Sequence, residues 1–149
     1  MGGSVVADLL EIDNNDVHRF SNKQFSILLN SLIGLESRGL ILSSRVVTRG
    51  GLAVSLCKMS FQNNIGVNVH LAKEKLSERL FNENLSILLE VHDADARNVE
   101  KILEKKDIPF DIIGSTCIEK TITINDKINL SINEAKNVWE HSLREKLLS

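Results

Sequence analysis

The sequence is short of aromatic side chains and of proline, and neither sign of charge dominates it. Among its 149 residues are five phenylalanines, one tryptophan, no tyrosine and one proline, Pro109. The formal net charge is -2, and no basic stripe with interleaved aromatic residues is present, which argues against a generic nucleic-acid binder. With one proline and little low-complexity sequence, we expect no long disordered linker.

Cysteine and long apolar runs are scarce as well. Cys57 and Cys117 are far apart, and neither belongs to a metal-binding pair or a Cys-x-x-Cys motif. We interpret both as reduced, mostly buried small hydrophobic residues of a cytoplasmic protein. No run approaches the length of a membrane span, and the first residues lack the pattern of a secretory signal. The histidines lie in separate segments without ligand spacing, so we expect no metal site.

The composition that remains is that of a globular domain, with 42% hydrophobic and 26% charged residues. We expect residues 1–20 to be an N-terminal linker segment and residues 21–149 to form a single domain. The acidic cluster at residues 13–16 lacks the central glycine and the distal glutamate of a calcium loop, and we interpret it as solvated linker.

Hydrophobic periodicity predicts alternating strands and helices, and therefore a mixed sheet with helices packed against it. The pattern predicts helices at residues 21–39, 51–64, 93–106 and 131–147, with a short charged helix or turn at 73–80. It predicts strands at residues 40–47, 66–71, 87–91 and 110–113, and a hairpin formed by residues 120–124 and 128–130.

Several details of these elements are also predicted. Ser21 is expected to cap the first of these helices, and Asp93 or Asp95 the third. The strand at 87–91 is expected to be covered on both faces, and Trp139 to anchor the last helix to the sheet. Two apolar helix faces are expected to point to the core: Phe25, Leu28, Leu29, Leu32 and Leu35 in the first helix, and Ala135, Val138, Trp139, Leu143 and Leu147 in the last.

A strand, two glycines and a helix at residues 46–59 form the one stretch that suggests a site. Glycines at such a junction allow close approach to a ligand, and the free N–H groups at a helix start favour an anion. The alternative is a tight turn that needs only permissive backbone angles, with Thr48 as a helix cap and Arg49 as a solvated side chain. There is no nucleophile-elbow pattern and no evident acid/base pair, so no catalytic residue is predicted.

The order of motifs resembles the C-terminal, second-half domain of the phosphoribosylformylglycinamidine synthase family, also called formylglycinamidine ribonucleotide synthetase. That family has His-Asp-x-Ser-Asp-Gly-Gly-Leu-Ala where residues 45–53 read Arg-Val-Val-Thr-Arg-Gly-Gly-Leu-Ala. Its Leu-Phe-Ser-Glu-Ser-x-Ser segment is similar to residues 80–86, its Ile-Gly strand to residues 112–114, and its closing Ala-Trp-Glu helix to residues 134–140. The residues before this domain in longer members resemble Gly2-Gly3-Ser4.

The resemblance implies an α/β (α+β) fold of three layers, with a mixed sheet and a partly ferredoxin-like arrangement, as in the C-terminal domain of aminoimidazole ribonucleotide synthetase. It implies a purine-biosynthesis ligase that uses ATP and magnesium, takes ammonia from glutamine and works with a glutaminase subunit and a small accessory subunit. Most of that machinery is expected in earlier domains of the same enzyme, so we expect this chain to be a domain fragment with little or no activity alone.

Departures from the family motifs narrow the predicted site. Val46 stands where the family has an aspartate able to hold magnesium, and Arg49 stands where it has a second aspartate. A valine does not ligate a hard cation, so metal binding is not predicted at this turn. Thr48, Arg49, Gly50 and Gly51 are predicted to bind a phosphate or nucleotide, with Glu83 from the second motif as a polar neighbour.

Two other interpretations stay open at this stage. One is a stand-alone ferredoxin-like module that binds an anion or a partner, which would not expose the apolar patches of a domain taken from a larger chain. The other is a hydrogenase-maturation or selenophosphate synthetase relative, since Thr-Arg-Gly-Gly-Leu-Ala at residues 48–53 resembles the maturation enzyme. That relative would need a reactive cysteine.

Overall fold

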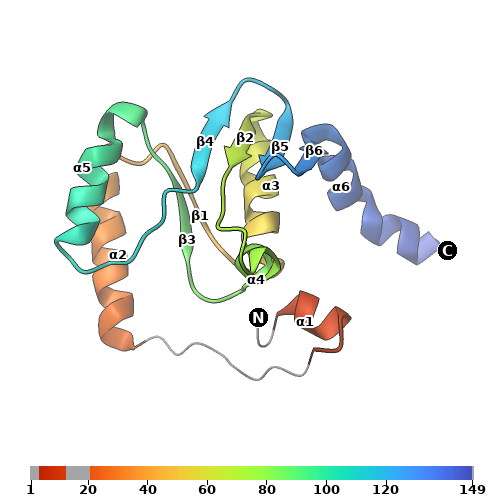
Figure 1. The fold of residues 1–149 in the computed structure, drawn as a ribbon, viewed down its shortest axis with the longest axis horizontal. Coiled ribbons are helices and arrows are strands. Elements are labelled where there is room, and N and C mark those ends of the chain that lie inside the picture. The colour runs from red at the N-terminus through yellow and green to blue at the C-terminus, as the bar shows by residue number, and fades with distance from the viewer. Residues whose placement is uncertain (1–3, 13–20, 149) are drawn as a thin grey trace.

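The computed structural model describes residues 4–12 and 21–148, and the side chains as far as residue 142. Helices and strands alternate in the middle of the chain, from the second helix to the fourth strand (Figure 1). The acidic cluster at residues 13–16 lies outside the described residues. The helices are α1 (Val5–Leu9), α2 (Asn22–Glu36), α3 (Gly51–Asn63), α4 (Leu76–Phe81), α5 (Asp93–Glu104) and α6 (Ile132–Leu148). The strands are β1 (Ser43–Val46), β2 (Gly66–Val69), β3 (Ile87–Glu90), β4 (Gly114–Cys117), β5 (Thr121–Ile124) and β6 (Ile128–Ser131).

The strands form one four-stranded mixed sheet and one two-stranded ribbon. The sheet has the order β4-β2-β5-β6, with β2 parallel to β5 and antiparallel to β4. β5 and β6 form the predicted hairpin, whose turn residues Asn125 and Asp126 have positive φ values of 52° and 54°. The ribbon pairs β1 with β3 antiparallel, from Ser43 opposite Glu90 to Val46 opposite Ile87. From β1 to β4 the order is β1-α3-β2-α4-β3-α5-β4, which is the order of a ferredoxin-like unit with the short helix α4 added between β2 and β3.

Two apolar cores lie on opposite faces of β3. Leu88 packs against the first core, between α3, α4 and the four-stranded sheet, and Leu89 packs against the second, between α2, α5 and the ribbon. The prediction that this strand is covered on both faces is confirmed, as is the mixed α/β class. The buried residues of the first core are Leu56, Val69, Leu71, Leu80, Ile122, Ile124 and Ile132. Those of the second are Leu35, Leu40, Val99 and Leu103.

The predicted strand at residues 110–113 is wrong. β4 begins at Gly114, and the apolar residues before it form a connection in which Ile112 is 70% exposed. His70 N–H donates to Ile113 O at 2.7 Å, and from there the chain runs beside β2. A Cβ on Gly114 would collide with Asn68 O, so the glycine permits close pairing. The observed strand therefore starts at Gly114, directly after the last residue of the predicted one.

The helix starts are partly as predicted. Ser21 caps α2 in a capping box, in which Gln24 N–H donates to Ser21 Oγ and Ser21 N–H donates to the Gln24 side chain. The predicted cap of α5 is wrong, because His92 is its N-cap and makes no side-chain cap bond. Asp93 and Asp95 lie in the first turn, where their charge interacts favourably with the helix dipole.

Two predicted helix faces are only partly buried. In α2, Ser31 and Leu35 are buried, whereas Phe25 and Leu29 are 43% and 40% exposed, so the core-facing stripe is narrower than expected. Ile27 and Leu28 are half-buried. The face of α2 that packs against the rest of the molecule is formed by residues 27, 28, 31 and 35. Phe25 and Leu29 lie on a neighbouring face that is exposed.

In α6 it is Ile132, at 1% exposure, that anchors the helix. Trp139 is 52% exposed and Val138 66%, so the prediction that Trp139 packs the helix onto the sheet is wrong. Lys58 of α3 instead places its Nζ 3.9 Å from the centre of the Trp139 ring, a cation–π contact. The far end of α6 extends away from the body (Figure 1). The side chains of Leu143 and Leu147 lie outside the described residues.

Candidate functional site at the glycine turn

The turn between β1 and α3 is built from two consecutive glycines with left-handed backbone angles. Gly50 has φ 87° and Gly51 φ 67°, values that L side chains rarely adopt. Gly51 N–H donates to Thr48 O at 2.9 Å, which closes the turn. Before the turn, Val47 N–H donates to Ser86 O at 2.9 Å and so extends the β1–β3 pairing towards it. The start of α3 is thereby fixed next to the segment that leads into β3.

Gly51 lies directly against the end of α4. A Cβ at this position would lie 2.5 Å from Leu80 O and 2.7 Å from Phe81 Cα, so only glycine fits without a backbone shift. The glycines were expected to let a ligand approach the backbone closely. At Gly51, the backbone at the end of α4 occupies that space instead. It also brings Asn82 and Glu83, which follow α4, beside the turn.

Glu83 supplies the anion at the start of α3. Its Oε1 atom accepts hydrogen bonds from Gly50 N–H at 2.8 Å and from Val5 N–H at 3.0 Å. Gly50 is the N-cap residue of α3 and makes no side-chain cap bond, and Val5 is the first residue of α1. One half-buried carboxylate oxygen therefore caps two helices. The alternative role of Thr48 as the cap of α3 is wrong.

The loop that carries Glu83 is stabilised locally. Asn84 N–H donates to Asn82 Oδ1 at 2.8 Å, a turn typical of asparagine. Asn82 and Asn84 stand where the resembling family has serines, and the asparagine at 82 thus has a role of its own in holding the loop. Nothing in the sequence indicated Val5 as the second partner of Glu83, because 78 residues separate them.

The structure brings Gly50, Gly51 and Glu83 together and leaves Thr48 and Arg49 exposed on the same turn. Within the part of the chain that the structure describes, neither Thr48 nor Arg49 forms a side-chain hydrogen bond or an ion pair. In the same part, the N–H groups of Leu52 and Ala53 in the first turn of α3 have no hydrogen-bond partner. Arg49 and these two donors are the groups at the turn that remain available to an anion.

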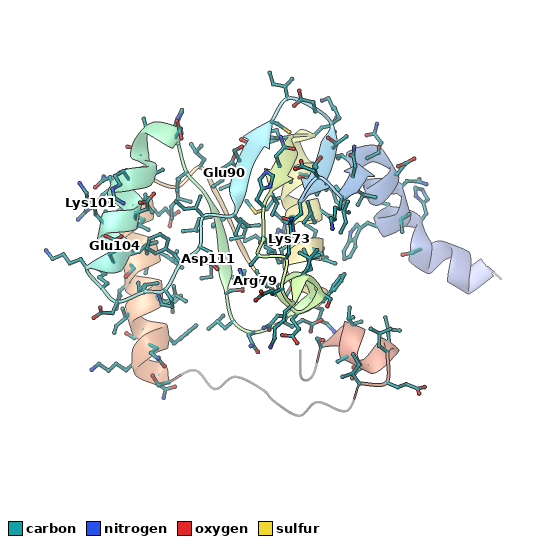
Figure 2. The ribbon with its side chains drawn as sticks, in the orientation of Figure 1. Lys73, Arg79, Glu90, Lys101, Glu104 and Asp111 are labelled. Carbon is teal, nitrogen blue, oxygen red and sulfur yellow. The ribbon has the colours of Figure 1, made fainter. Side chains whose placement is uncertain are left out.

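A second polar region lies beside α4, in a shallow depression of about 330 Å³. Arg79, on its rim, places Nη1 3.5 Å from Asp111 Oδ2, and both residues are labelled in Figure 2. Lys75 and Glu78 form a second pair at 3.5 Å. Both basic side chains that line the depression, Lys75 and Arg79, are therefore already paired with a carboxylate.

The cysteines lie apart from this turn and are both free. Each is partly buried, whereas both were expected to be mostly buried. Burial raises the pKa of the Cys57 thiol above its ordinary value, and burial followed by contact with Glu119 raises the pKa of Cys117. Among residues 4–12 and 21–148 there is no group of three or more His, Cys, Asp or Glu side chains placed to hold a metal ion. In the same ranges, no helix has both the length and the apolar character needed to cross a membrane.

The fold and the turn together define a class of protein. It is a mixed α/β domain of ferredoxin-like element order, in which α3 starts on two glycines with left-handed backbone angles. A family model described as AIR synthase related protein, C-terminal domain, matches residues 6–127. The chain belongs to this family, and the predicted resemblance is confirmed.

Curated relatives with this domain are subunits of a purine-synthesis enzyme. The chain is 30% identical to the phosphoribosylformylglycinamidine synthase subunit PurL of Picrophilus torridus over 99% of its own length, and 36% identical to that of Methanocaldococcus jannaschii over 66%. It spans 19% and 14% of those two proteins, about a fifth of their length or less. The Picrophilus match also includes the Ala-Trp-Glu segment of α6, which lies beyond residue 127.

Solved structures agree on the fold. The PurLQS structure from Thermotoga maritima superposes with a TM-score of 0.70 at 14% identity, covering 80% of this chain and 22% of that one. PurL of T. maritima complexed with ATP gives a TM-score of 0.65 at 14% identity, covering 73% of this chain and 21% of that one. These similarities confirm the predicted fold class.

Proposed function

We propose that this chain acts as the C-terminal domain of an ATP-dependent ligase that converts formylglycinamide ribonucleotide, glutamine and ATP to formylglycinamidine ribonucleotide in the cytoplasm. Family membership and the similarity to PurL over nearly the whole chain carry this proposal. Because the chain spans about a fifth of such relatives, we propose that it has little or no ligase activity alone. ATP and magnesium would serve the complete enzyme, with ammonia supplied from glutamine.

An exposed apolar stripe favours a domain of a larger assembly over a stand-alone module. Phe25, Leu29 and Ile33 follow one another at four-residue spacing on α2 and are 43%, 40% and 62% exposed. A contiguous apolar row of this kind is typical of a surface that another protein segment covers. We propose that other domains of the same enzyme cover it, and that a glutaminase subunit and a small accessory subunit join the assembly.

Within this function, we propose that Thr48, Arg49, Gly50 and Gly51 contact a phosphate group, with Glu83 as a polar neighbour. The free N–H groups of Leu52 and Ala53, the positive end of the α3 dipole and the exposed guanidinium of Arg49 support anion binding. Val46 is 48% exposed beside the turn and offers no oxygen ligand, so no magnesium is proposed there.

The two cysteines do not favour the alternative that the chain is a hydrogenase-maturation or selenophosphate synthetase relative. A reactive thiol needs a lowered pKa, and the pKa of both thiols is raised by burial. The stand-alone anion-binding module remains the second candidate, because it uses the same glycine turn. It differs in needing no covering domain over α2.

Calorimetric titration with ADP and ATP, with and without magnesium, tests the phosphate proposal. Arg49→Glu is the informative variant, because its exposed side chain can change without disturbing the fold. Arg38→Glu, an equally exposed change of the same charge, is the matched control. Saturable binding that Arg49→Glu weakens at least about tenfold, with Arg38→Glu unchanged, supports the site. Absence of binding by the parent chain, or equal binding by both variants, contradicts it.

An activity assay tests the wider function. The chain alone is expected to form no formylglycinamidine ribonucleotide from the three substrates. A synthase that carries residues 4–148 in place of its own corresponding domain is expected to keep measurable turnover. Turnover by the isolated chain, or a fully inactive but folded chimera, contradicts the proposed role.

A further inference from the structure

We infer that the N-terminal segment, residues 4–12, is a strap that the Glu83 carboxylate holds against the glycine turn, and that an anion at the start of α3 competes with this strap. The inference rests on the proposed phosphate site and describes its regulation. In this arrangement Glu83 is a positioning residue, since it acts on the turn and on the strap through their backbone N–H groups.

The strap is docked by a small buried face. Ser4 is 0% exposed and Ala7 2%, whereas Leu9 and Leu10 on the same segment are 75% and 63% exposed. Ala7 N–H donates to Ser4 Oγ at 3.2 Å, which caps α1 internally. A helix of five residues is far too short to be stable alone, so its position depends on contacts with the rest of the molecule.

Glu83 provides a charged contact for this docking. Its Oε1 joins the first N–H of α1 to the N-cap N–H of α3, and both groups carry the positive end of a helix dipole. Hydrogen bonds to a charged acceptor are roughly twice as strong as neutral ones. Loss of the carboxylate therefore weakens the strap and leaves Gly50 N–H without its acceptor.

Competition follows from the shared donor. A phosphate that takes the Gly50 N–H together with those of Leu52 and Ala53 must displace the Glu83 carboxylate, because two anions cannot share one N–H at the same point. Displacement of Glu83 also removes the acceptor of Val5 N–H. Strap docking and anion binding at this turn are then negatively coupled, and by linkage each weakens the other by the same factor.

Amide hydrogen exchange measured by NMR tests the strap. Asp8 and Ile12 are suitable probes, since their N–H groups donate to Ser4 O and Ala7 O within the segment. Glu83→Ala is expected to speed exchange at both by about tenfold or more, and Glu83→Gln by a smaller factor. The matched control, Glu78→Gln on the same helix–loop unit, changes a half-buried carboxylate whose ion pair among the described residues is with Lys75, and exchange is expected to stay as in the parent.

A proline variant separates the strap from general damage to the fold. Val5→Pro deletes the N–H that donates to Glu83 and leaves the Glu83 carboxylate itself unchanged, and proline is well tolerated at the first position of a helix after an extended residue such as Ser4. Fast exchange at Asp8 and Ile12, with Gly50 and the core amide of Ile122 still protected, is the expected result. Parent-like exchange in both Val5→Pro and Glu83→Ala overturns the strap.

Titration with ADP tests the competition. Exchange at Asp8 and Ile12 in the parent is expected to speed up as ADP binds, and Val5→Pro is expected to bind ADP several-fold more tightly than the parent. Binding without any change in exchange overturns the competition. Failure of every variant to bind ADP overturns the proposed phosphate site, whereas the exchange results in the absence of ADP still decide whether the strap exists.

Discussion

At the scale of single residues, Gly51 and Gly34 show how differently two glycines contribute. Gly51 combines φ 67° with backbone atoms 2.5 Å from the position of a Cβ, whereas a Cβ on Gly34, inside α2, would meet nothing within 4 Å. We expect Gly51→Ala to lower the free energy of unfolding by about 2–4 kcal/mol, through a strained backbone angle and overpacking. Gly34→Ala should raise it by about 0.5–1 kcal/mol. Urea unfolding of both variants checks this, and equal effects would contradict it.

The thiols give a second prediction at this scale. The raised pKa of Cys57 keeps it protonated to higher pH than an ordinary thiol, and only the thiolate reacts with alkylating agents. Iodoacetamide at pH 8 should therefore label Cys57 of the native chain more slowly than the same cysteine in urea. The rate should rise as pH increases through and beyond 9. Mass spectrometry of labelled peptides measures both rates, and native labelling as fast as in urea would refute the prediction.

Sequence reasoning found part of the turn and missed the rest for a physical reason. Gly50, Gly51 and Glu83 were identified from short motifs, and the structure brings them together. The second bond of Glu83, to Val5, spans 78 residues and involves a backbone N–H, which every residue except proline carries. No pattern in the sequence marks such a partner. Thr48 was a reasonable cap by residue type, but the carboxylate from the other loop occupies the capping role.

At the scale of elements, the deeply buried residue of α6 lies in its first turn. Ile132 is 1% exposed in the first core, and Trp139, two turns later, is 52% exposed. We expect Ile132→Ala to cost about 2–5 kcal/mol of stability, the usual range for a buried isoleucine. Trp139→Ala should cost less than the roughly 3–5 kcal/mol of a buried tryptophan, because much of its ring is already in contact with water. Thermal unfolding of the two variants gives the comparison, and a larger loss for Trp139→Ala would show that the helix is attached elsewhere.

Elements with strong local signals were predicted well. The cap at Ser21, the glycine turn before α3 and the hairpin at β5 and β6 all follow from patterns within a few residues. The strand predicted at residues 110–113 was wrong because apolar composition alone does not make a strand. Its backbone begins to pair only where it reaches β2, whose residues are far from it in the sequence.

At the scale of the whole molecule, the exposed apolar stripe on α2 predicts a surface that associates with other apolar surfaces. Replacing Phe25, Leu29 and Ile33 by serine should reduce binding of a dye specific for exposed apolar surface, and should reduce self-association in light scattering. Because all three side chains are substantially exposed, the change in stability should be modest, apart from the lower helix propensity of serine. A matched triple change to alanine at Lys23, Ser26 and Asn30, all exposed on the same helix, should leave dye binding unchanged. Equal dye binding by both variants would contradict the prediction.

The mixed α/β class could be predicted from the alternation of strand and helix patterns. The division of the strands into a four-stranded sheet and a two-stranded ribbon could not. Nothing local to β1 or β3 shows that, among the described strands, these two pair with each other alone, while β2 pairs with β4 and β5. That choice is decided by which core each face of β3 enters, through Leu88 on one side and Leu89 on the other. Such long-range selection depends on the assembled tertiary structure.

Because β2 lies between β4 and β5, it can be paired on both sides only after those later strands have been synthesised. Val67 of β2 pairs with Thr116 and Ile122, so both of its neighbouring strands are synthesised about fifty residues after it. Ile122, Ile124 and Ile132, three of the buried residues of the first core, come later still than most of the residues that they cover. A nascent chain that has left the ribosome only as far as α5 therefore presents Val69 and Leu71 without their cover. The first core is completed only once Ile132, at the start of α6, has emerged, and until then those apolar side chains stay exposed on the growing chain.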